Sequence, residues 1–323
     1  MKKYLGIDIG GTKCAAVLGK WNGVQIHIAE KRQCYTDHSV SAETMLERIC
    51  QMANEMNLSG LSAVGISCGG PLDSEHGVIL GPPNLPGWDC VPIKALLEKQ
   101  FACPVYLEND ANACALAEWK FGAGQGCKNM LFLTFGTGLG AGMILNGRLY
   151  TGTNGNAGEV GHIRLAEYGP VGYGKSGSFE GFCSGGGLSQ LGWLAAIEQT
   201  QSCEYPLYYH PDMAPKDITA KSLSDAARNG DVTASRVYEL CGSQLGRGLS
   251  ILIDLLNPER IIIGSIFSRA HELLWPATER VLQREALAAS LQCCTVLPSA
   301  LGESIGDYAA LGVALAKEDE THD

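Results

Sequence analysis

The order of apolar and polar residues along the chain predicts an α/β protein, in which short buried strands are interspersed with amphipathic helices. Uncharged runs of β-branched, aromatic and aliphatic residues predict strands at residues 4–9, 14–18, 62–67, 104–108, 131–135, 141–145, 260–263 and 295–297. Apolar residues at helical spacing predict helices at residues 41–56, 92–101, 232–256 and 307–316, and others that end near Phe121 or begin near Leu188, after 222–225 and near Ala270.

Two glycine-rich turns have the same position relative to the strands around them. Gly10–Lys13 joins the first two predicted strands, and Gly136–Gly140 joins the strands at 131–135 and 141–145. Glycine reaches positive φ and lets backbone N–H groups approach an anion closely, so both turns are candidate phosphate loops. Their repetition predicts an internal duplication, with two similar halves that each present a loop to a shared cleft.

The two turns differ in that only the first follows an acid, Asp8. One carboxylate that orients one Mg–nucleotide is what a phosphoryl-transfer site requires. An ordinary β-turn at Gly10-Gly11 is the alternative interpretation. A third glycine turn, Gly264-Ser265, follows the strand at 260–263 and is suited to the far side of a nucleotide.

Asp110 lies between the strand at 104–108 and a helix, and the sequence permits two interpretations of it. It could be the N-cap of that helix. It could also lie at the C-terminal edge of a parallel sheet, where α/β active sites are found, and accept the proton of an attacking hydroxyl group. The two roles are compatible.

Glu159 and His162 stand among glycines shortly after the second turn. Hydroxyl-binding groups next to a phosphate loop indicate that a nucleotide and a polyol are held side by side. Residues 169–176 match the pattern GxxxxGK[ST], but we predict no P-loop there. That motif follows a strand and opens a helix, and the glycines at 177, 181 and 185–187 are too numerous for a first helical turn.

Composition narrows the class of protein. The formal net charge of −10 and the lack of Lys/Arg clusters argue against a nucleic-acid partner. No apolar run reaches membrane length, and no signal peptide is expected, because the first predicted strand begins at residue 4. Thirteen cysteines without a CxxC pair indicate reduced, mostly buried thiols, and hence a cytoplasmic protein.

Five segments, in this order, resemble the ROK family of sugar kinases and repressors, within the actin/hexokinase/Hsp70 superfamily. They are residues 8–13, 83–88, 108–113, 136–140 and 158–162. The resemblance implies an α/β fold with two actin-like (ribonuclease H-like) domains around a central cleft. We expect an N-terminal domain of residues 1–115 plus 303–323 and a C-terminal domain of residues 116–302.

The resemblance also implies the roles of individual residues. Asp110 is expected to be the catalytic base, and Asp8 to orient Mg²⁺, directly or through water. The ATP contacts are expected to be Asp8, Gly10, Gly11, Thr12, Lys13, Gly136, Thr137, Gly138, Gly140 and Gly264. The sugar contacts are expected to be Gly70, Asn84, Asn109, Asp110, Glu159, His162 and Glu180.

One departure from the family pattern concerns zinc. Where the family has zinc-binding cysteines after the histidine, this chain has Gly172, Gly174 and Ser178. One histidine cannot hold a structural Zn²⁺, so we predict no zinc site and expect Cys183 to be a packed thiol.

The sequence therefore predicts an ATP-dependent kinase that phosphorylates a hexose, glucose first, at its 6-hydroxyl group. The alternative acceptors are an N-acetylhexosamine (N-acetylglucosamine or N-acetylmannosamine), fructose or allose. A non-catalytic sugar-binding regulator and an acetate-kinase-like or chaperone ATPase are alternatives of other classes. The family's repressors carry an N-terminal helix-turn-helix, and none is expected here because the chain opens on a strand. A homodimer is expected from the resemblance alone.

Overall fold

The structure is a computed structural model that describes residues 1–322, with side chains described as far as Glu318. The chain forms two compact units. The first comprises Met1–Gly126, Gly142–Ala157 and Glu303–Asp323, and the second comprises Cys127–Ala141 and Gly158–Gly302. The domain boundaries expected from the sequence remain predictions.

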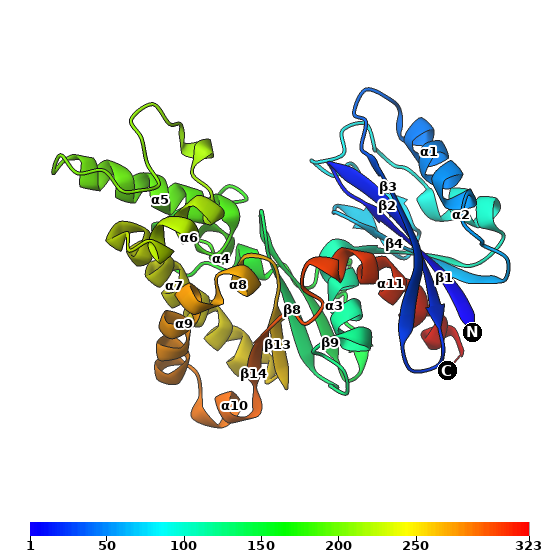
Figure 1. Cartoon of the computed structure of the whole chain (residues 1–323). Coiled ribbons are helices and arrows are strands. Elements are labelled where there is room, and N and C mark those ends of the chain that lie inside the picture. The colour runs from blue at the N-terminus through cyan, green and yellow to red at the C-terminus, as the bar shows by residue number, and fades with distance from the viewer. Residues whose placement is uncertain (323) are drawn as a thin grey trace. The chain divides into compact units, whose positions relative to one another are not determined.

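A five-stranded sheet of order β3-β2-β1-β4-β7 lies at the centre of the first unit (Figure 1). β1 pairs antiparallel with β2 and parallel with β4, which in turn is parallel to β7. Because β1, β4 and β7 are parallel, their C-terminal ends lie at the same edge of the sheet. The strands are β1 (Lys2–Ile9), β2 (Lys13–Trp21), β3 (Ile26–Tyr35), β4 (Leu61–Cys68) and β7 (Val105–Asn109).

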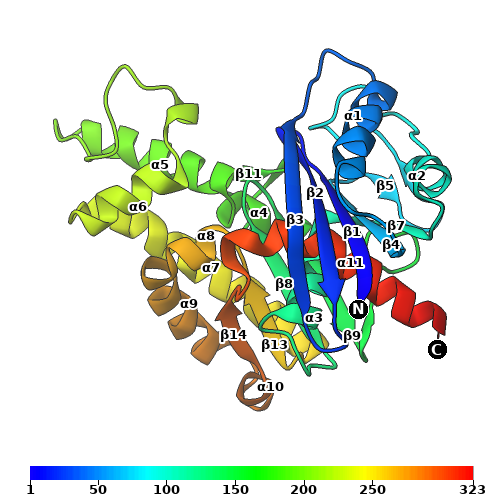
Figure 2. The same cartoon turned by 45° about the vertical axis from the view of Figure 1, so that its right-hand side comes forward.

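Helices cover both faces of this sheet (Figure 2). Apolar residues of α1 (Ala42–Asn54) and α2 (Ile93–Phe101) share one core with β1, β4 and β7. On the other face, α11 (Ile305–His322) packs on β1 and β4, next to α3 (Asp110–Phe121). The approach of α11 is very close, since a Cβ atom at Gly65 would lie 2.0 Å from the carbonyl oxygen of Ala310.

The second five-stranded sheet has the order β10-β9-β8-β13-β14. β9 and β10 are antiparallel, while β8 and β14 both run parallel to β13. A hairpin, an edge strand and two parallel strands thus recur in the order found in the first sheet, which confirms the predicted duplication of the topology. The strands are β8 (Met130–Phe135), β9 (Leu139–Leu145), β10 (Arg148–Leu149), β13 (Arg260–Ile263) and β14 (Thr295–Pro298).

The seven described α-helices of the second unit all lie between β10 and β14 in the sequence. Gly242 and Gly246 let α7 and α9 approach closely, since a Cβ atom at either glycine would lie within 2.7 Å of a backbone oxygen of α9. The helices are α4 (Phe179–Phe182), α5 (Gly185–Thr200), α6 (Ala220–Arg228), α7 (Val232–Leu256), α8 (Ile266–Arg269), α9 (His271–Glu285) and α10 (Ala288–Cys293). Two short hairpins complete the fold, β5 (Leu72–Asp73) with β6 (Val78–Ile79) and β11 (Val171–Gly172) with β12 (Lys175–Ser176).

Several local predictions need correction. α5 begins at Gly185 and not near Leu188, because Ser184 caps it and accepts a hydrogen bond from the N–H of Gly187. α6 begins at Ala220 and not after residues 222–225, because Thr219 and Ser222 form its capping box. By contrast, residues 169–176 form part of the β11–β12 hairpin, which confirms that they are not a P-loop.

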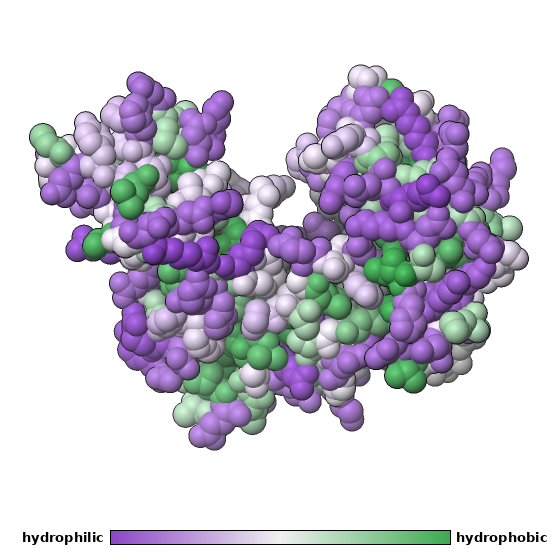
Figure 3. Space-filling model, in the orientation of Figure 1, coloured by the Kyte–Doolittle hydropathy of each residue, from purple (hydrophilic) through white to green (hydrophobic). Residues whose placement is uncertain are grey.

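All thirteen cysteines are free thiols, but Cys90, Cys203 and Cys293 are exposed, so the expectation of buried thiols is wrong for these three. Within residues 1–322, none of the helices combines the length and the apolar character needed to cross a membrane. Hydrophilic residues cover most of the face drawn in Figure 3, and the apolar ones form small scattered patches.

Candidate active site

Carboxylates gather at the edge of the first sheet where β1, β4 and β7 end. Asp8, at the end of β1, accepts a hydrogen bond from the Ser67 hydroxyl group of β4. Burial, together with the negative charges of Asp110 and Asp307, raises the pKa of Asp8 to about 6, against the opposing effects of Ser67 and Lys13. This edge therefore concentrates negative charge that a cation or a proton would neutralise.

Asn109 and Asp110 occupy the junction of β7 and α3. The N-cap of α3 is Asn109, whose Oδ1 accepts a hydrogen bond from the N–H of Asn112 at 2.8 Å, so the interpretation of Asp110 as the N-cap is wrong. Asp110 is the first residue of the helix, and its Oδ1 accepts the N–H of Ala111 at 2.8 Å. Among the described residues, the other oxygen of Asp110 and the side-chain NH₂ group of Asn109 have no hydrogen-bond partner, so both can contact a ligand.

Asp110 remains accessible to solvent, but the protein around its carboxyl group removes enough water to raise its pKa. Hydrogen bonds from backbone N–H groups act in the opposite direction. Burial and the charges of Asp110 and Asp8 likewise raise the pKa of the neighbouring thiols of Cys68 and Cys114. These thiols are therefore poor nucleophiles, and Asp110 is the better candidate for proton transfer at this edge.

The first glycine turn keeps two amides open. The carbonyl oxygens of Gly10 and Gly11 accept hydrogen bonds from the side chains of Thr36 and His38, at 2.6 and 2.8 Å. The N–H of Gly10 bonds to Lys13, while among the described residues the N–H groups of Gly11 and Thr12 have no acceptor. Open N–H groups at the tip of a turn are suited to an anion.

Asn84 lies beside this turn. A Cβ atom at Gly11 would be 2.7 Å from the carbonyl oxygen of Asn84, and one at Gly69 would be 3.5 Å from its side-chain amide. Gly70 has open space around its Cα. The structure thus brings the predicted residues of the 8–13 turn, Gly70 and Asn84 together in the first unit.

The second glycine turn also has two open amides, but not those of its outer glycines. The N–H of Gly136 bonds to the oxygen of Gly138 at 3.1 Å, and the N–H of Gly140 bonds to the hydroxyl group of Thr134 at 2.9 Å. Within the described part of the chain, the N–H groups of Thr137 and Gly138 have no acceptor. Gly136 and Gly138 do not have positive φ, so the expected conformational reason for glycine here is wrong.

The start of α5 was missed by sequence reasoning, although it lies against this turn. The N–H of Gly185 donates to the carbonyl oxygen of Gly136 at 2.7 Å. Gly264, in the third predicted glycine turn, directly follows β13 in the same unit. The next residue, Ser265, lies near the second turn, since its Oγ would be 3.7 Å from a Cβ atom at Gly136. The run Ser184-Gly185-Gly186-Gly187 was the available signal, since a capping serine before glycines permits a helix to start close to another backbone.

Glu159, His162 and Glu180, the predicted sugar contacts of the second unit, come from two neighbouring elements. Glu159 precedes a 3-10 turn at Val160–His162, and both its side chain and that of His162 are exposed. Glu180 lies in α4, and a Cβ atom at Gly161 would be 3.1 Å from the Cβ of Glu180. The structure brings these residues into one part of the second unit.

Hydrogen bonds hold the segment that carries Glu180. The Gln190 side chain makes two bonds of 2.9 Å with the backbone of Val171, and Lys175 donates to the carbonyl oxygen of His162 at 2.7 Å. Phe179 and Cys183 are fully buried on either side of Glu180, so Cys183 is packed as expected. Among the described residues no three His, Cys, Asp or Glu side chains form a metal site, and the absence of zinc stays a prediction.

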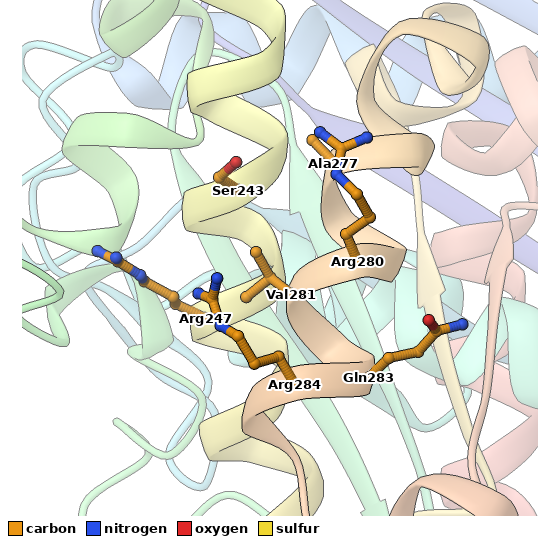
Figure 4. A pocket seen from close by; sticks show the side chains of 7 residues that line it. All are labelled: Ser243, Arg247, Ala277, Arg280, Val281, Gln283 and Arg284. Atoms are coloured by element: carbon orange, nitrogen blue, oxygen red, sulfur yellow. The ribbon is translucent and has the colours of Figure 1, made fainter.

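A pocket of about 510 Å³ lies elsewhere, between α7 and α9. It contains none of the predicted site residues, and the side chains of Arg247 and Arg280 point away from each other (Figure 4). Arg280 is paired with Glu239 at 2.7 Å, and Arg284 with Glu285 at 2.8 Å. This pocket is therefore a surface groove with largely neutralised charge, and it adds nothing to the candidate site.

The repeated sheets define the class of protein first, because their topology is that of the actin-like two-domain fold found in solved kinase structures. The chain belongs to the ROK family, whose sequence model matches residues 4–318.

Relatives within the family are of two kinds. The chain is 35% identical over 284 residues to a glucokinase of Thermotoga maritima, with 87% of each chain covered. It is 32% identical over 294 residues to the DNA-binding transcriptional dual regulator NagC of Escherichia coli, covering 89% of this chain and 68% of the regulator. A ROK glucokinase of Streptomyces griseus, solved with glucose and AMPPNP, matches with a TM-score of 0.75 and 31% identity, covering 97% of this chain and 99% of that one.

Proposed function

We propose that this protein is an ATP-dependent sugar kinase that phosphorylates a hexose, glucose first, at its 6-hydroxyl group. The observation that supports this best is Asp110, held at the end of β7. One of its carboxylate oxygens is bonded to the helix, and the other has no partner among the described residues. A binding module has no need of a solvent-accessible carboxylate whose pKa is raised beside a second acid. The kinship to glucokinases and the S. griseus complex with glucose and AMPPNP support the choice of donor and acceptor.

In the proposed reaction, the sugar hydroxyl group gives its proton to Asp110 while its oxygen attacks the γ-phosphorus of ATP. The bond from that phosphorus to the β,γ-bridging oxygen breaks, and ADP leaves. The proposed contacts of the sugar are Asn84, Asn109, Glu159, His162 and Glu180. The open amides of Gly11, Thr12, Thr137 and Gly138 bind phosphate oxygens and stabilise the charge that develops on them.

The residues near Asp8 fit a magnesium ion. Mg²⁺ prefers oxygen ligands and is bound by one or two carboxylates together with phosphate oxygens and water. Asp8 would orient the ion, directly or through water, and its raised pKa shows that a positive charge is favoured there. The bound ion would neutralise charge on the phosphates.

The proposal is tested by measuring ADP formation with ATP, Mg²⁺ and a panel of sugars, followed by ³¹P and ¹³C NMR of the product. The panel includes glucose, N-acetylglucosamine, N-acetylmannosamine, fructose and allose. We expect sugar-dependent turnover and a phosphate ester on the 6-oxygen, with glucose giving the highest kcat/KM.

The kinship to NagC supports a second candidate, a sugar-binding regulator without catalysis. It predicts that the protein binds a sugar with no ADP formation above background on any member of the panel. That result would refute the kinase. Turnover of an N-acetylhexosamine in preference to glucose would refute only the choice of sugar.

A further inference from the structure

Glu180 contacts the second glycine turn directly. Its Oε2 accepts a hydrogen bond from the N–H of Leu139 at 3.0 Å. Leu139 follows Thr137 and Gly138, whose N–H groups are the open amides of that turn. A side chain expected to bind sugar is therefore bonded to the backbone expected to bind phosphate.

Three glycines enclose the Glu180 side chain. A Cβ atom at Gly138 would lie 2.7 Å from Oε2, and Cβ atoms at Gly161 and Gly172 would lie 3.1 and 2.9 Å from the Cβ of Glu180. These glycines belong to the phosphate turn, the 158–162 segment and the β11–β12 hairpin. The side chain has little room to move, so its carboxylate limits the positions that the turn can take.

The backbone of Glu180 is also anchored. Ser178 caps α4 and accepts the N–H of Gly181 at 3.0 Å, and the fully buried Phe179 ring fills the space left by Gly248. Only one carboxylate oxygen is occupied, because Oε1 of Glu180 has no partner among the described residues. One rigid carboxylate can thus hold Leu139 with one oxygen and accept a hydroxyl group with the other.

We propose that Glu180 is a positioning residue that couples sugar binding to nucleotide binding. The inference rests on the proposed function, because it requires the sugar to reach Oε1 and the phosphates to reach the turn. A sugar hydroxyl group that donates to Oε1 restrains the carboxylate further, and the Leu139 bond passes this restraint to the amides of Thr137 and Gly138. Bound sugar therefore reduces the freedom left to the turn and favours ATP binding, and bound ATP favours sugar binding to the same extent.

The test is the Kd of AMPPNP, measured by calorimetry on the full chain with and without saturating glucose. For the wild type we expect glucose to tighten AMPPNP binding about 5- to 20-fold, within the usual range of coupling between two sites. Glu180→Asp keeps the charge but is too short to reach Leu139, so the tightening should fall to less than about 2-fold. Glu180→Gln keeps an acceptor for Leu139 and should retain most of it.

Glu159→Gln is the matched control, because Glu159 is a predicted sugar contact without a bond to the turn. It should weaken glucose binding and, at saturating glucose, keep the coupling. Equal coupling in the wild type and Glu180→Asp, or no coupling in the wild type, would overturn the inference. A wild type that turns over sugar but shows no coupling refutes only the inference, whereas failure of sugar turnover on the whole panel refutes the proposed function. If Glu180→Asp does not fold, Glu180→Ala takes its place, because it also removes the acceptor of the Leu139 N–H. It should lose the coupling that Glu180→Gln and Glu159→Gln keep.

Discussion

The ionised carboxylate of Asp8 destabilises the folded protein, because it is buried beside other negative charges. Its pKa in the folded protein, about 6, lies above the ordinary value of 3.8, because burial and two neighbouring carboxylates oppose its ionisation. The folded state therefore binds the proton more tightly than the unfolded state does. The stabilisation that this gives is complete below about pH 4 and is lost as the pH rises through about 6.

Asp8→Asn removes this charge and should stabilise the free protein at pH 7.5 by about 1–3 kcal/mol, an upper range set by the size of the pKa shift. The difference from the wild type should shrink steadily between about pH 6 and pH 4. Urea denaturation at a series of pH values measures it. Asp212→Asn, on an exposed segment, controls for the chemical change. An Asp8→Asn protein whose advantage is the same at pH 4.5 and 7.5 would contradict the account.

Glu108 stabilises the junction of β7 and α3, which carries Asp110. It is 1% exposed, and its Oε1 accepts bonds from the Ser74 hydroxyl group, the N–H of Asn109 and the Asn112 amide. Glu108→Ala leaves these donors without an acceptor and should destabilise the protein by about 2–4 kcal/mol, measured by urea denaturation. Glu108→Gln keeps an acceptor and should cost less, so the reverse order would show that this interpretation is wrong.

At the scale of elements, the first unit depends on close packing of α11 against β4. A Cβ atom at Gly65 would lie 2.0 Å from Ala310 O and 2.6 Å from Ala314 N, so Gly65→Ala must displace α11 from β4. We expect a loss of about 3 kcal/mol in the free energy of unfolding. At Gly6 the nearest atom would be 3.0 Å away, so Gly6→Ala should cost about 1 kcal/mol. Equal Tm values for the two variants would contradict this.

The segment around α4 yields a prediction about metal removal. Because Gln190, Lys175 and buried apolar residues hold it, EDTA should leave the Tm unchanged, and metal analysis should find no zinc. Gln190→Leu removes both bonds to Val171 and should lower the free energy of unfolding by about 1–2 kcal/mol. One equivalent of tightly held zinc in the purified protein would contradict the prediction.

Local patterns in the sequence were sufficient for the elements with strong periodicity or clear end signals. α7 was predicted at the residues where it occurs, since its apolar face is long and Asn257 ends it in a left-handed conformation. The edge strand β3 was not predicted, because most of its residues are exposed and polar, so it lacks a buried run. The prediction that α5 begins near Leu188 is wrong, because the Ser184 cap outweighs the low helix propensity of the three glycines that follow it.

Contacts between distant residues were out of reach of the sequence. Nothing local places Asp307 near Asp8, or the carboxylate of Glu180 on Leu139. The glycines of the second turn were predicted for the wrong reason, since at Gly138 the limit is the space taken by Glu180 and not a positive φ. The order of the motifs thus indicates the candidate site residues, whereas the residues that contact them can be identified only from the folded structure.

At the scale of the whole molecule, the duplicated sheets give each half a hairpin turn with two open amides, at Gly11 and Thr12 and at Thr137 and Gly138. The acids are not duplicated, because Asp8 and Asp110 belong to the first unit only. The proposed reaction uses this asymmetry, because its proton acceptor, Asp110, belongs to the first unit.

The most direct test compares glucose binding and glucose-dependent ADP formation in the wild type and in Asp110→Asn. Removal of a general base should lower kcat by about 10²- to 10⁴-fold, while the Kd for glucose, measured by calorimetry, changes by no more than about 5-fold. Asp212→Asn should match the wild type in both measurements. Near-normal turnover by Asp110→Asn would contradict the central claim that this carboxylate accepts the proton of the sugar hydroxyl group.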